Sequence, residues 1–420
     1  MARTYLPRVA DGELAARMSS AGAVLIEGPK ACGKTATATQ VARSVVRLDV
    51  DAGARALVAA APEVLFGQQT PILFDEWQIE PALWDLVRRA VDDRSPQRGQ
   101  FILTGSATPN DATRRHSGAG RISTLRMRPM SLHEAGYSTG SVSLRDLFAG
   151  DTPAAVDPGV TIPELVDQIV VGGWPDLVGV GVGVGDAQQW LRDYLRNLVE
   201  VDVQTLGVRR DPQQVRKLLT ALGRGVGTEM SVQSLAKDIG GADGPADRDT
   251  VAAYLKTLNR LMVVEDIPAW APHMRSSTPL RKSPTRYMVD PSLGVAALGT
   301  GPRQLLADLG ATGFHFEAMV TRDLSVYTQP LGGTLSHWRD NNGHEIDVVV
   351  TLEDGRWAAL EVKMNPDHAD DAARSILRFL EKVDTSKVGE PTFSAVITTR
   401  SPAYRRPDGV LVVPIATLGP

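Results

Sequence analysis

The stretch Gly28-Pro29-Lys30-Ala31-Cys32-Gly33-Lys34-Thr35 decides how the first part of this chain folds. It lies between the apolar run 23–26 and an Ala- and Thr-rich segment of helical character, and it has the pattern G-x-x-x-x-G-K-[ST]. Glycines permit a tight turn whose backbone N–H groups surround a phosphate, and the helix N-terminus adds partial positive charge. The stretch therefore predicts a nucleoside triphosphate site, with Lys34 on the β- and γ-phosphates and Thr35 on Mg²⁺.

Length and composition set the class of protein. A chain of 420 residues is too long to fold around a single hydrophobic core, so we expect two to three domains. The net charge of −4 gives no overall nucleic-acid signature, and one cysteine excludes an intramolecular disulfide framework. No apolar stretch of about twenty residues is present to span a bilayer. We therefore expect a soluble, cytoplasmic protein with no membrane partner.

A second apolar run, Ile72-Leu73-Phe74, ends in Asp75-Glu76. Such a run suits a buried parallel strand with acids at its carboxyl end. In P-loop proteins the first acid belongs to the Mg²⁺ shell, and the second activates the attacking water as a general base. We assign these roles to Asp75 and Glu76. The alternative is that both acids cap the helix that follows Pro81.

A third buried strand, 101–106, ends in hydroxyl residues. When an additional strand lies between the two nucleotide-binding strands of a P-loop ATPase, its polar terminus contacts the γ-phosphate or the water. Thr104 and Ser106 are the candidates for this role. Their alternative role is to cap the next turn.

An arginine follows the polar loop 107–120. Arg121 is placed to neutralise charge on the γ-phosphate, either within its own chain or across to a neighbouring subunit. Arg114 and Arg115 compete for the same role, and a surface salt bridge is the alternative for Arg121. The sequence leaves the oligomeric state open.

Taken together, these motifs resemble those of the AAA+-related prokaryotic ATPases that carry a C-terminal domain of unknown function. The resemblance covers residues 5–140, and it extends to Gly172-Gly173-Trp174-Pro175 and to the region of Glu200-Val201-Asp202. It implies a five-stranded parallel sheet with the phosphate-loop strand near its middle. Family members more often carry an arginine where Val201 stands. The motifs in the first region are Gly28 to Thr35, Leu73 to Glu76, Leu103 to Ser106, Gly120-Arg121 and Pro129 to Glu134.

The middle of the chain changes composition twice. Residues 141–160 are rich in Gly, Ser, Asp and Pro, so we expect a linker. Residues 161–268 show helical periodicity, and 211–265 have the pattern of a winged helix-turn-helix. The exposed positions of its third helix are not strongly basic, so packing against protein stays open beside DNA binding.

The last region, 269–420, contains a second set of charged residues among apolar ones. Asp347 lies in one expected strand, while Glu361 and Lys363 lie on one face of the next, so a hairpin brings them together. This acid–acid–lysine set is that of restriction-endonuclease-like folds, although Ile346 stands where a proline is usual. Glu317, on a helix, is the possible third acid, and such carboxylates suit a hard divalent cation.

The predicted fold class is α/β: a P-loop sheet domain in 1–140, then a winged helix, then a restriction-endonuclease-like domain. The leading hypothesis is an ATP- and Mg²⁺-binding ATPase whose nucleotide state repositions the other modules, acting on DNA or RNA. The rival is an ATP-dependent switch whose nuclease-like domain only docks a protein partner.

Overall fold

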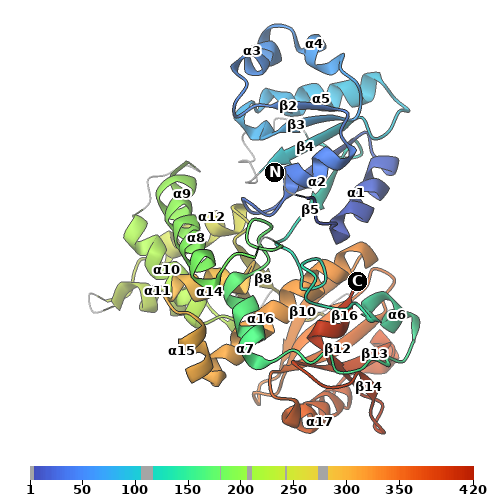
Figure 1. Ribbon diagram of the computed structural model, residues 1–420, viewed down its shortest axis with the longest axis vertical. Helices are drawn as coiled ribbons and strands as arrows, with labels where there is room; N and C mark the ends of the chain where they lie inside the picture. Colours follow the sequence, from blue (N-terminus) through green and yellow to red (C-terminus); the bar gives the residue numbers. More distant parts are fainter. Residues whose placement is uncertain (1–3, 106–116, 180, 206–210, 242–243, 273–281) are drawn as a thin grey trace. The chain divides into compact units, whose positions relative to one another are not determined.

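The fold is described from a computed structural model, which defines residues 4–105, 117–179, 181–205, 211–241, 244–272 and 282–420 (Figure 1). The chain divides into two compact units: Met1–Pro129 with Arg260–Met262, and Met130–Asn259 with Val263–Pro420. Within the described residues, no helix is both long and apolar enough to cross a bilayer.

The first unit is built on a five-stranded sheet in the order β2-β3-β4-β1-β5, and every neighbouring pair is parallel. This is the parallel sheet that the resemblance implied. The strand β4 lies between β1 and β3, as expected for the additional strand. The strands are β1 (Ala23–Glu27), β2 (Ser44–Arg47), β3 (Ile72–Asp75), β4 (Phe101–Gly105) and β5 (Ile122–Arg126).

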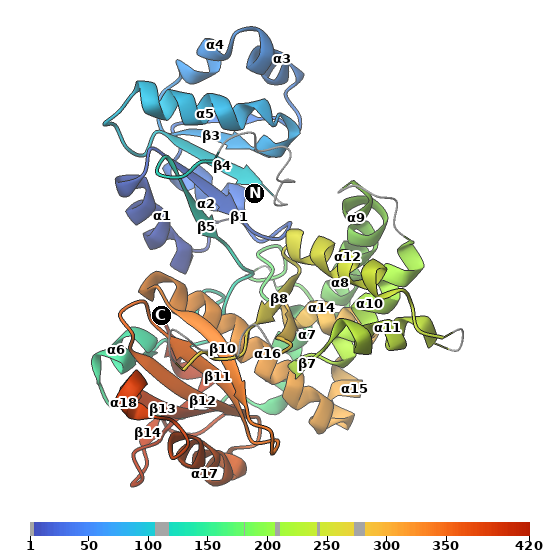
Figure 2. The ribbon, with the colours of Figure 1, turned by 180° about the vertical axis from the view of Figure 1, so that it is seen from behind.

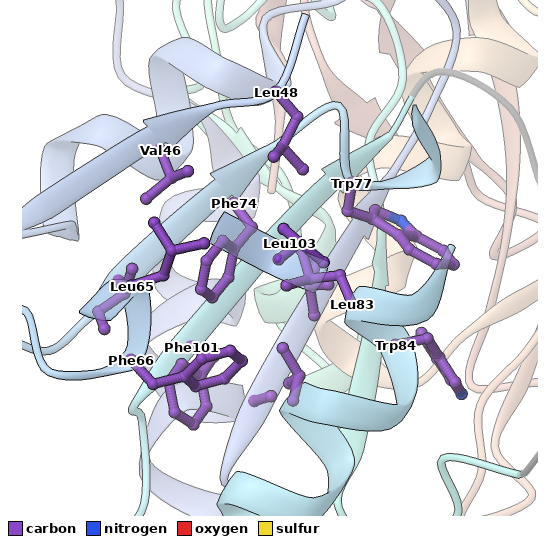
Figure 3. Close-up of a cluster of buried hydrophobic side chains, with 14 of the residues drawn as sticks. Val46, Leu48, Leu65, Phe66, Phe74, Trp77, Leu83, Trp84, Phe101 and Leu103 are labelled. Carbon is purple, nitrogen blue, oxygen red and sulfur yellow. The ribbon is translucent and has the colours of Figure 1, made fainter. Parts of the chain in front are cut away.

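Helices cover both faces of this sheet, because its central strands are apolar on both sides (Figures 1 and 2). On one face, α3, α4 and α5 pack over a core that includes Phe66, Phe74 and Phe101 (Figure 3). On the other face, α1 and α2 contribute Leu14 and Ala38. The helical elements are α1 (Val9–Ser20), α2 (Lys34–Val41), α3 (Ala52–Ala60), α4 (Pro62–Phe66), η1 (Trp77–Ile79) and α5 (Ala82–Asp93).

The register of the sheet determines what meets at its carboxyl edge. Glu27 lies opposite Gly105 and Arg126, and Asp75 lies opposite Thr104. The phosphate loop after β1 and the acid that ends β3 therefore share one edge.

The second unit begins with a helical region that contains a small antiparallel sheet in the order β7-β9-β8. Three of its helices, α10, α11 and α12, precede β8 and β9 in the chain. Aromatic packing of Trp174 against Trp190 and Tyr194 joins α8 to the turn after α7. The elements are α7 (Ile162–Val171), α8 (Val184–Asn197), η2 (Leu198–Asp202), α9 (Val203–Thr205), α10 (Pro212–Arg224), β7 (Thr228–Glu229), α11 (Val232–Gly240), α12 (Arg248–Arg260), β8 (Val264–Ile267), β9 (Thr285–Met288), α14 (Pro291–Ala297) and α15 (Pro302–Ala307).

The rest of the second unit is a six-stranded sheet in the order β10-β11-β12-β13-β15-β14. β10, β11 and β12 are antiparallel, whereas β13 and β15 run parallel to β12. The helix α17 packs on one face of the sheet, where its Phe379 lies against Trp357 of β12. The elements are α16 (Leu309–Thr328), η4 (Gln329–Leu331), β10 (Thr334–Arg339), β11 (Glu345–Thr351), β12 (Trp357–Lys363), η5 (Pro366–His368), α17 (Ala369–Leu380), α18 (Thr385–Val388), β13 (Phe393–Thr398), β14 (Tyr404–Arg405), β15 (Leu411–Pro414) and η6 (Ile415–Thr417).

Two segments differ from the predicted domain limits. The expected linker contains β6 (Val142–Ser143) and α6 (Leu144–Ala149), and β6 pairs with β16 (Leu418–Gly419) near the carboxyl terminus. This segment folds because its apolar side chains are buried, with Phe148 in edge contact with Phe393. β9, expected in the last domain, pairs instead with β7 and β8.

Candidate functional site

The phosphate loop has the backbone that its glycines predict. Gly33 begins α2 with φ of 102°, a left-handed conformation that glycine adopts without strain. Gly28 lies so close to the chain that a Cβ there would be 2.4 Å from the Met127 carbonyl oxygen. The loop therefore packs directly against the chain that follows β5, and only glycine fits at position 28. Lys30, Ala31 and Cys32 complete the loop between Gly28 and Gly33.

Lys34 and Thr35 follow the loop in the first turn of α2. Lys34 is buried, and its Nζ donates to the carbonyl oxygens of Gly28 (3.0 Å) and Pro29 (2.8 Å). The lysine therefore lies over the loop whose phosphate it is predicted to contact. Its two carbonyl partners fix the position of the ammonium.

Asp75 accepts two hydroxyl hydrogen bonds at the end of β3. Thr35 Oγ1 donates to Asp75 Oδ1 at 2.8 Å, and Thr104 Oγ1 donates to the same oxygen. The hydroxyl of Thr104 thus contacts the carboxylate of Asp75, and its contact with the γ-phosphate stays a prediction. The three residues come from α2, β3 and β4, and they form one connected polar group.

Glu76 follows Asp75 in a left-handed conformation, with φ of 54° and ψ of 44°. It begins the short turn η1, and the side-chain amide of Gln78 donates to its Oε2. Gln78 was not identified from the sequence. The only available signal was its position two residues after the acidic pair.

Arg121 does not lie beside the phosphate loop. It precedes β5, and its carbonyl accepts from the Ala23 N–H, at the amino edge of a parallel sheet whose carboxyl edge carries the loop. Its Nε donates to Asp92 at 2.8 Å, and both side chains are exposed. A role within its own chain is therefore wrong, because the sheet separates Arg121 from the loop. Ser106, Arg114 and Arg115 lie outside the described residues.

A second residue that the sequence did not indicate is Arg8. Its side chain is 7% exposed and donates to the carbonyl oxygens of Cys32 (2.8 Å) and Arg128 (2.7 Å). The segment before α1 thus holds the phosphate loop in place through the hydrogen bond from Arg8 to the Cys32 carbonyl. Nothing in the local pattern around Arg8 distinguishes it from an exposed arginine.

The residues present fit a magnesium nucleotide. The glycine loop supplies backbone N–H groups, the buried lysine over it supplies a cation, and the carboxylate joined to a threonine hydroxyl supplies oxygen ligands. Oxygen ligands are those that Mg²⁺ prefers.

The predicted acid–lysine set is assembled in the second unit. β11 and β12 form the expected antiparallel pair, and Lys363 Nζ lies 2.7 Å from Glu361 Oε2 and 3.5 Å from Asp347 Oδ2. The Val362 N–H also donates to Asp347 at 2.7 Å. These three side chains line an open pocket of about 460 Å³, together with His344, Ser375 and Arg378.

Electrostatics in this pocket are unusual. Burial, with the nearby charge of Asp347, raises the pKa of Glu361 to about 8. Burial lowers the pKa of Lys363, but the charges of Asp347 and Glu361 outweigh it and the net shift is upward. Strongly shifted groups in one pocket are typical of functional sites, and also of buried ion pairs.

Glu317, the possible third acid, is held by a tyrosine. On α16 it accepts a hydrogen bond of 2.6 Å from Tyr287 Oη, and burial raises its pKa well above its usual range. In the part of the chain that the structure describes, no group of three or more His, Cys, Asp or Glu side chains is arranged to hold a metal ion. Asp347 and Glu361 are bridged by Lys363, and the charges of Asp347 and Lys363 also act on Glu317, whose role as a third acid stays a prediction.

Comparison with known families identifies the part of the chain that carries the phosphate loop. Residues 20–136 match the AAA domain. The first unit is thus an AAA-type P-loop ATPase-like domain, as the motifs predicted. Residues 162–304 and 312–418 match two domains of unknown function, DUF8612 and DUF4143. The first of these ranges includes β9, α14 and the beginning of α15, in agreement with the pairing of β9 with β7 and β8.

Whole-chain comparisons find relatives in mycobacteria. The chain is 27% identical over 360 residues to uncharacterized protein Rv2008c of Mycobacterium tuberculosis and to uncharacterized protein Mb2031c of Mycobacterium bovis, covering 85% of this chain and 73% of each relative. It is also similar to a solved structure, the Walker-type ATPase PABY2304 of Pyrococcus abyssi, with a TM-score of 0.42 and 14% identity over 70% of this chain and 96% of that one.

Proposed function

We propose that this protein is a Mg²⁺-dependent ATP hydrolase whose nucleotide state controls a nuclease-like module acting on nucleic acid. The observation that carries the ATPase part is the hydrogen bond between Thr35 and Asp75, which joins the phosphate loop to the acid on β3. It supports one site in which Lys34 binds the phosphates while Thr35 and Asp75 hold the cation shell.

Each residue of the proposed nucleotide site has a part in hydrolysis. The loop N–H groups and Lys34 neutralise the phosphate chain, and bound Mg²⁺ supplies charge stabilisation at the oxygens of the transferred group. Thr104 keeps Asp75 oriented through its hydroxyl. Glu76, the next residue, accepts the proton of the attacking water, a general-base contribution of about 10²–10⁴ in rate.

The second unit is the proposed effector. Three helices followed by β8 and β9 are the elements expected of a winged helix, and the pair β11–β12 carries the acid–lysine set. Glu361 and Asp347 supply the carboxylates for one divalent cation, and Lys363 is placed to stabilise a phosphate or a water. The chain passes from the first unit into the second at residues 129–130, so nucleotide-dependent movement of β5 has a covalent route to it.

The ATPase part is tested with purified full-length protein. We expect Lys34→Ala to abolish ATP binding in calorimetry, and Glu76→Gln to bind ATP without releasing phosphate. Lys387→Ala, an exposed lysine of α18 paired with Asp384, is the matched control and should leave both unchanged. Normal phosphate release by Glu76→Gln would remove that residue from catalysis.

The nucleic-acid part is tested with Mg²⁺ or Mn²⁺, ATP, and single- and double-stranded DNA and RNA. We expect binding, ATPase stimulation and nicking, with nicking lost in Asp347→Asn and retained in Asp354→Asn, an exposed turn residue paired with Arg356. Absence of binding and nicking in the unmodified protein would refute the nuclease proposal.

One observation favours a second candidate, an ATP-dependent switch whose carboxyl-terminal domain docks a protein. Lys363 already neutralises Asp347 and Glu361, as in a structural ion pair. This candidate predicts that a protein partner co-purifies in a nucleotide-dependent manner and that Lys363→Ala leaves that association intact.

A further inference from the structure

Gln78 contacts the carboxylate that is proposed to activate water. It lies in the η1 turn that Glu76 begins, and its Nε2 donates to Glu76 Oε2. The side chain of Gln78 is only partly exposed, and the neighbouring Trp77 is buried in the core of the sheet domain (Figure 3). The base and its donor thus share one short, well-packed turn.

The other end of the Gln78 amide lies at β4. Its Oε1 is buried and accepts no hydrogen bond from any described residue. A Cβ added at Gly105 would be 2.7 Å from this oxygen and 3.2 Å from Trp77 Nε1. The amide therefore occupies a slot that exists because β4 ends in a glycine.

The orientation of this amide follows from its neighbours. If the amide were turned over, its oxygen would face the carboxylate of Glu76, and two acceptors would meet with no proton between them. The present orientation gives Glu76 a donor and leaves Oε1 without a donor among the described residues. Native proteins rarely leave a buried polar atom unpaired without a functional reason.

We infer that Gln78 is a positioning residue for ATP hydrolysis, which holds the carboxylate of Glu76 toward the attacking water. This inference rests on the proposed ATPase function. A glutamate has three rotatable side-chain bonds, and a general base works only when its oxygen lies within hydrogen-bond reach of the water. Gln78 restricts Glu76 without touching the nucleotide, so it acts on turnover and leaves binding unchanged.

The main variant is Gln78→Met, which keeps the length of the side chain and removes the donor. We expect kcat for ATP hydrolysis to fall about tenfold to a hundredfold, with KM and ATP affinity within about twofold of the unmodified protein. Gln78→Glu, which replaces the donor by an acceptor, should lose at least as much. Gln68→Met, at an exposed position of the same unit, is the control and should retain full activity.

A double variant separates positioning from a merely structural role. Because Gln78 acts through Glu76, Gln78→Met combined with Glu76→Gln should be no slower than Glu76→Gln alone. The inference is overturned if the double variant loses a further tenfold, if Gln78→Met has normal kcat, or if both Gln78 variants lose ATP affinity together with turnover. Failure of the unmodified protein to hydrolyse ATP overturns the proposed function as well; normal hydrolysis with unaffected Gln78 variants overturns this inference alone.

Discussion

Thr35 Oγ1 donates a hydrogen bond of 2.8 Å to Asp75 Oδ1 across forty residues of chain. The contact exists because β1 and β3 run in the same direction, so the loop after one and the acid that ends the other meet at one edge of the sheet. It joins the two motifs that the sequence shows separately.

Removing the Thr35 hydroxyl should impair hydrolysis. In Thr35→Ala we expect kcat to fall by about a hundredfold and the Mg²⁺ requirement to rise, because a ligand of the cation shell is lost. Phosphate release measured over a Mg²⁺ titration checks this. Thr39→Ala, about one turn further along α2, removes a hydroxyl that donates only to the Ala36 carbonyl and should behave normally. Equal kinetics for the two variants would contradict the role of Thr35.

Arg322 should be essential to the folding of the second unit. Its buried guanidinium lies 2.8 Å from Asp290 and 2.7 Å from Asp323, and both carboxylates are fully buried. In Arg322→Met these two buried carboxylates lose their cationic partner and keep only hydrogen bonds, so we expect a loss of about 3–5 kcal/mol in unfolding free energy.

The matched control is Arg374→Met, which removes an exposed ion pair with Asp371 and should cost at most about 1 kcal/mol. Thermal and denaturant unfolding measure both variants. A similar small effect at Arg322 would mean that the two aspartates find other partners.

The Tyr287 hydroxyl should stabilise the second unit through Glu317. Tyr287→Phe removes the donor at 2.6 Å and leaves a buried carboxyl oxygen with one partner fewer, so we expect a loss of about 1–3 kcal/mol. Tyr404→Phe, at an exposed position, is the control for loss of a hydroxyl. The midpoint of thermal unfolding should fall for Tyr287→Phe alone; equal midpoints would argue against this contact.

Acid should destabilise the second unit through His315. Burial lowers the pKa of His315 to about 4, from an ordinary value of 6.5. The unfolded chain therefore binds the proton more readily, and the stabilisation present above pH 6.5 is lost as the pH falls toward 4.

His315→Gln should remove this part of the pH dependence, which amounts to about 1–3 kcal/mol. Unfolding free energies measured from pH 7.5 to 4 in both proteins give the difference. His368→Gln, at an exposed position, should leave the slope unchanged. A parallel pH slope in His315→Gln would show that this histidine is not the group responsible.

Much of the first unit was predictable, because each of its signals is local. Gly28 to Thr35 carry a spacing that only a phosphate-binding turn requires, and an apolar strand that ends in Asp75 and Glu76 has a defined direction. The AAA domain match over residues 20–136 agrees with both. In the second unit, alternation along β12 predicted that Glu361 and Lys363 lie on one face, and their side chains form an ion pair there.

The local sequence pattern was not enough to predict the position of Arg121. Its place after a polar loop suggested the phosphate edge, but the direction of β5 puts it at the opposite edge, beside Asp92. Composition predicts a linker over 141–160, but within it the burial of a few apolar side chains in 142–149 determines how this segment packs beside β16.

The sequence by itself determined the chemistry of the phosphate site, because consecutive residues and one strand terminus specify it. Only the tertiary structure decided which residues from distant parts of the sequence lie beside that site. Strand order and direction place Thr104 on Asp75, keep Arg121 away from the loop, and leave Gly105 beside the amide of Gln78. These relationships depend on how β1, β3, β4 and β5 pair, and strand pairing depends on the whole sheet, which no local stretch of residues specifies.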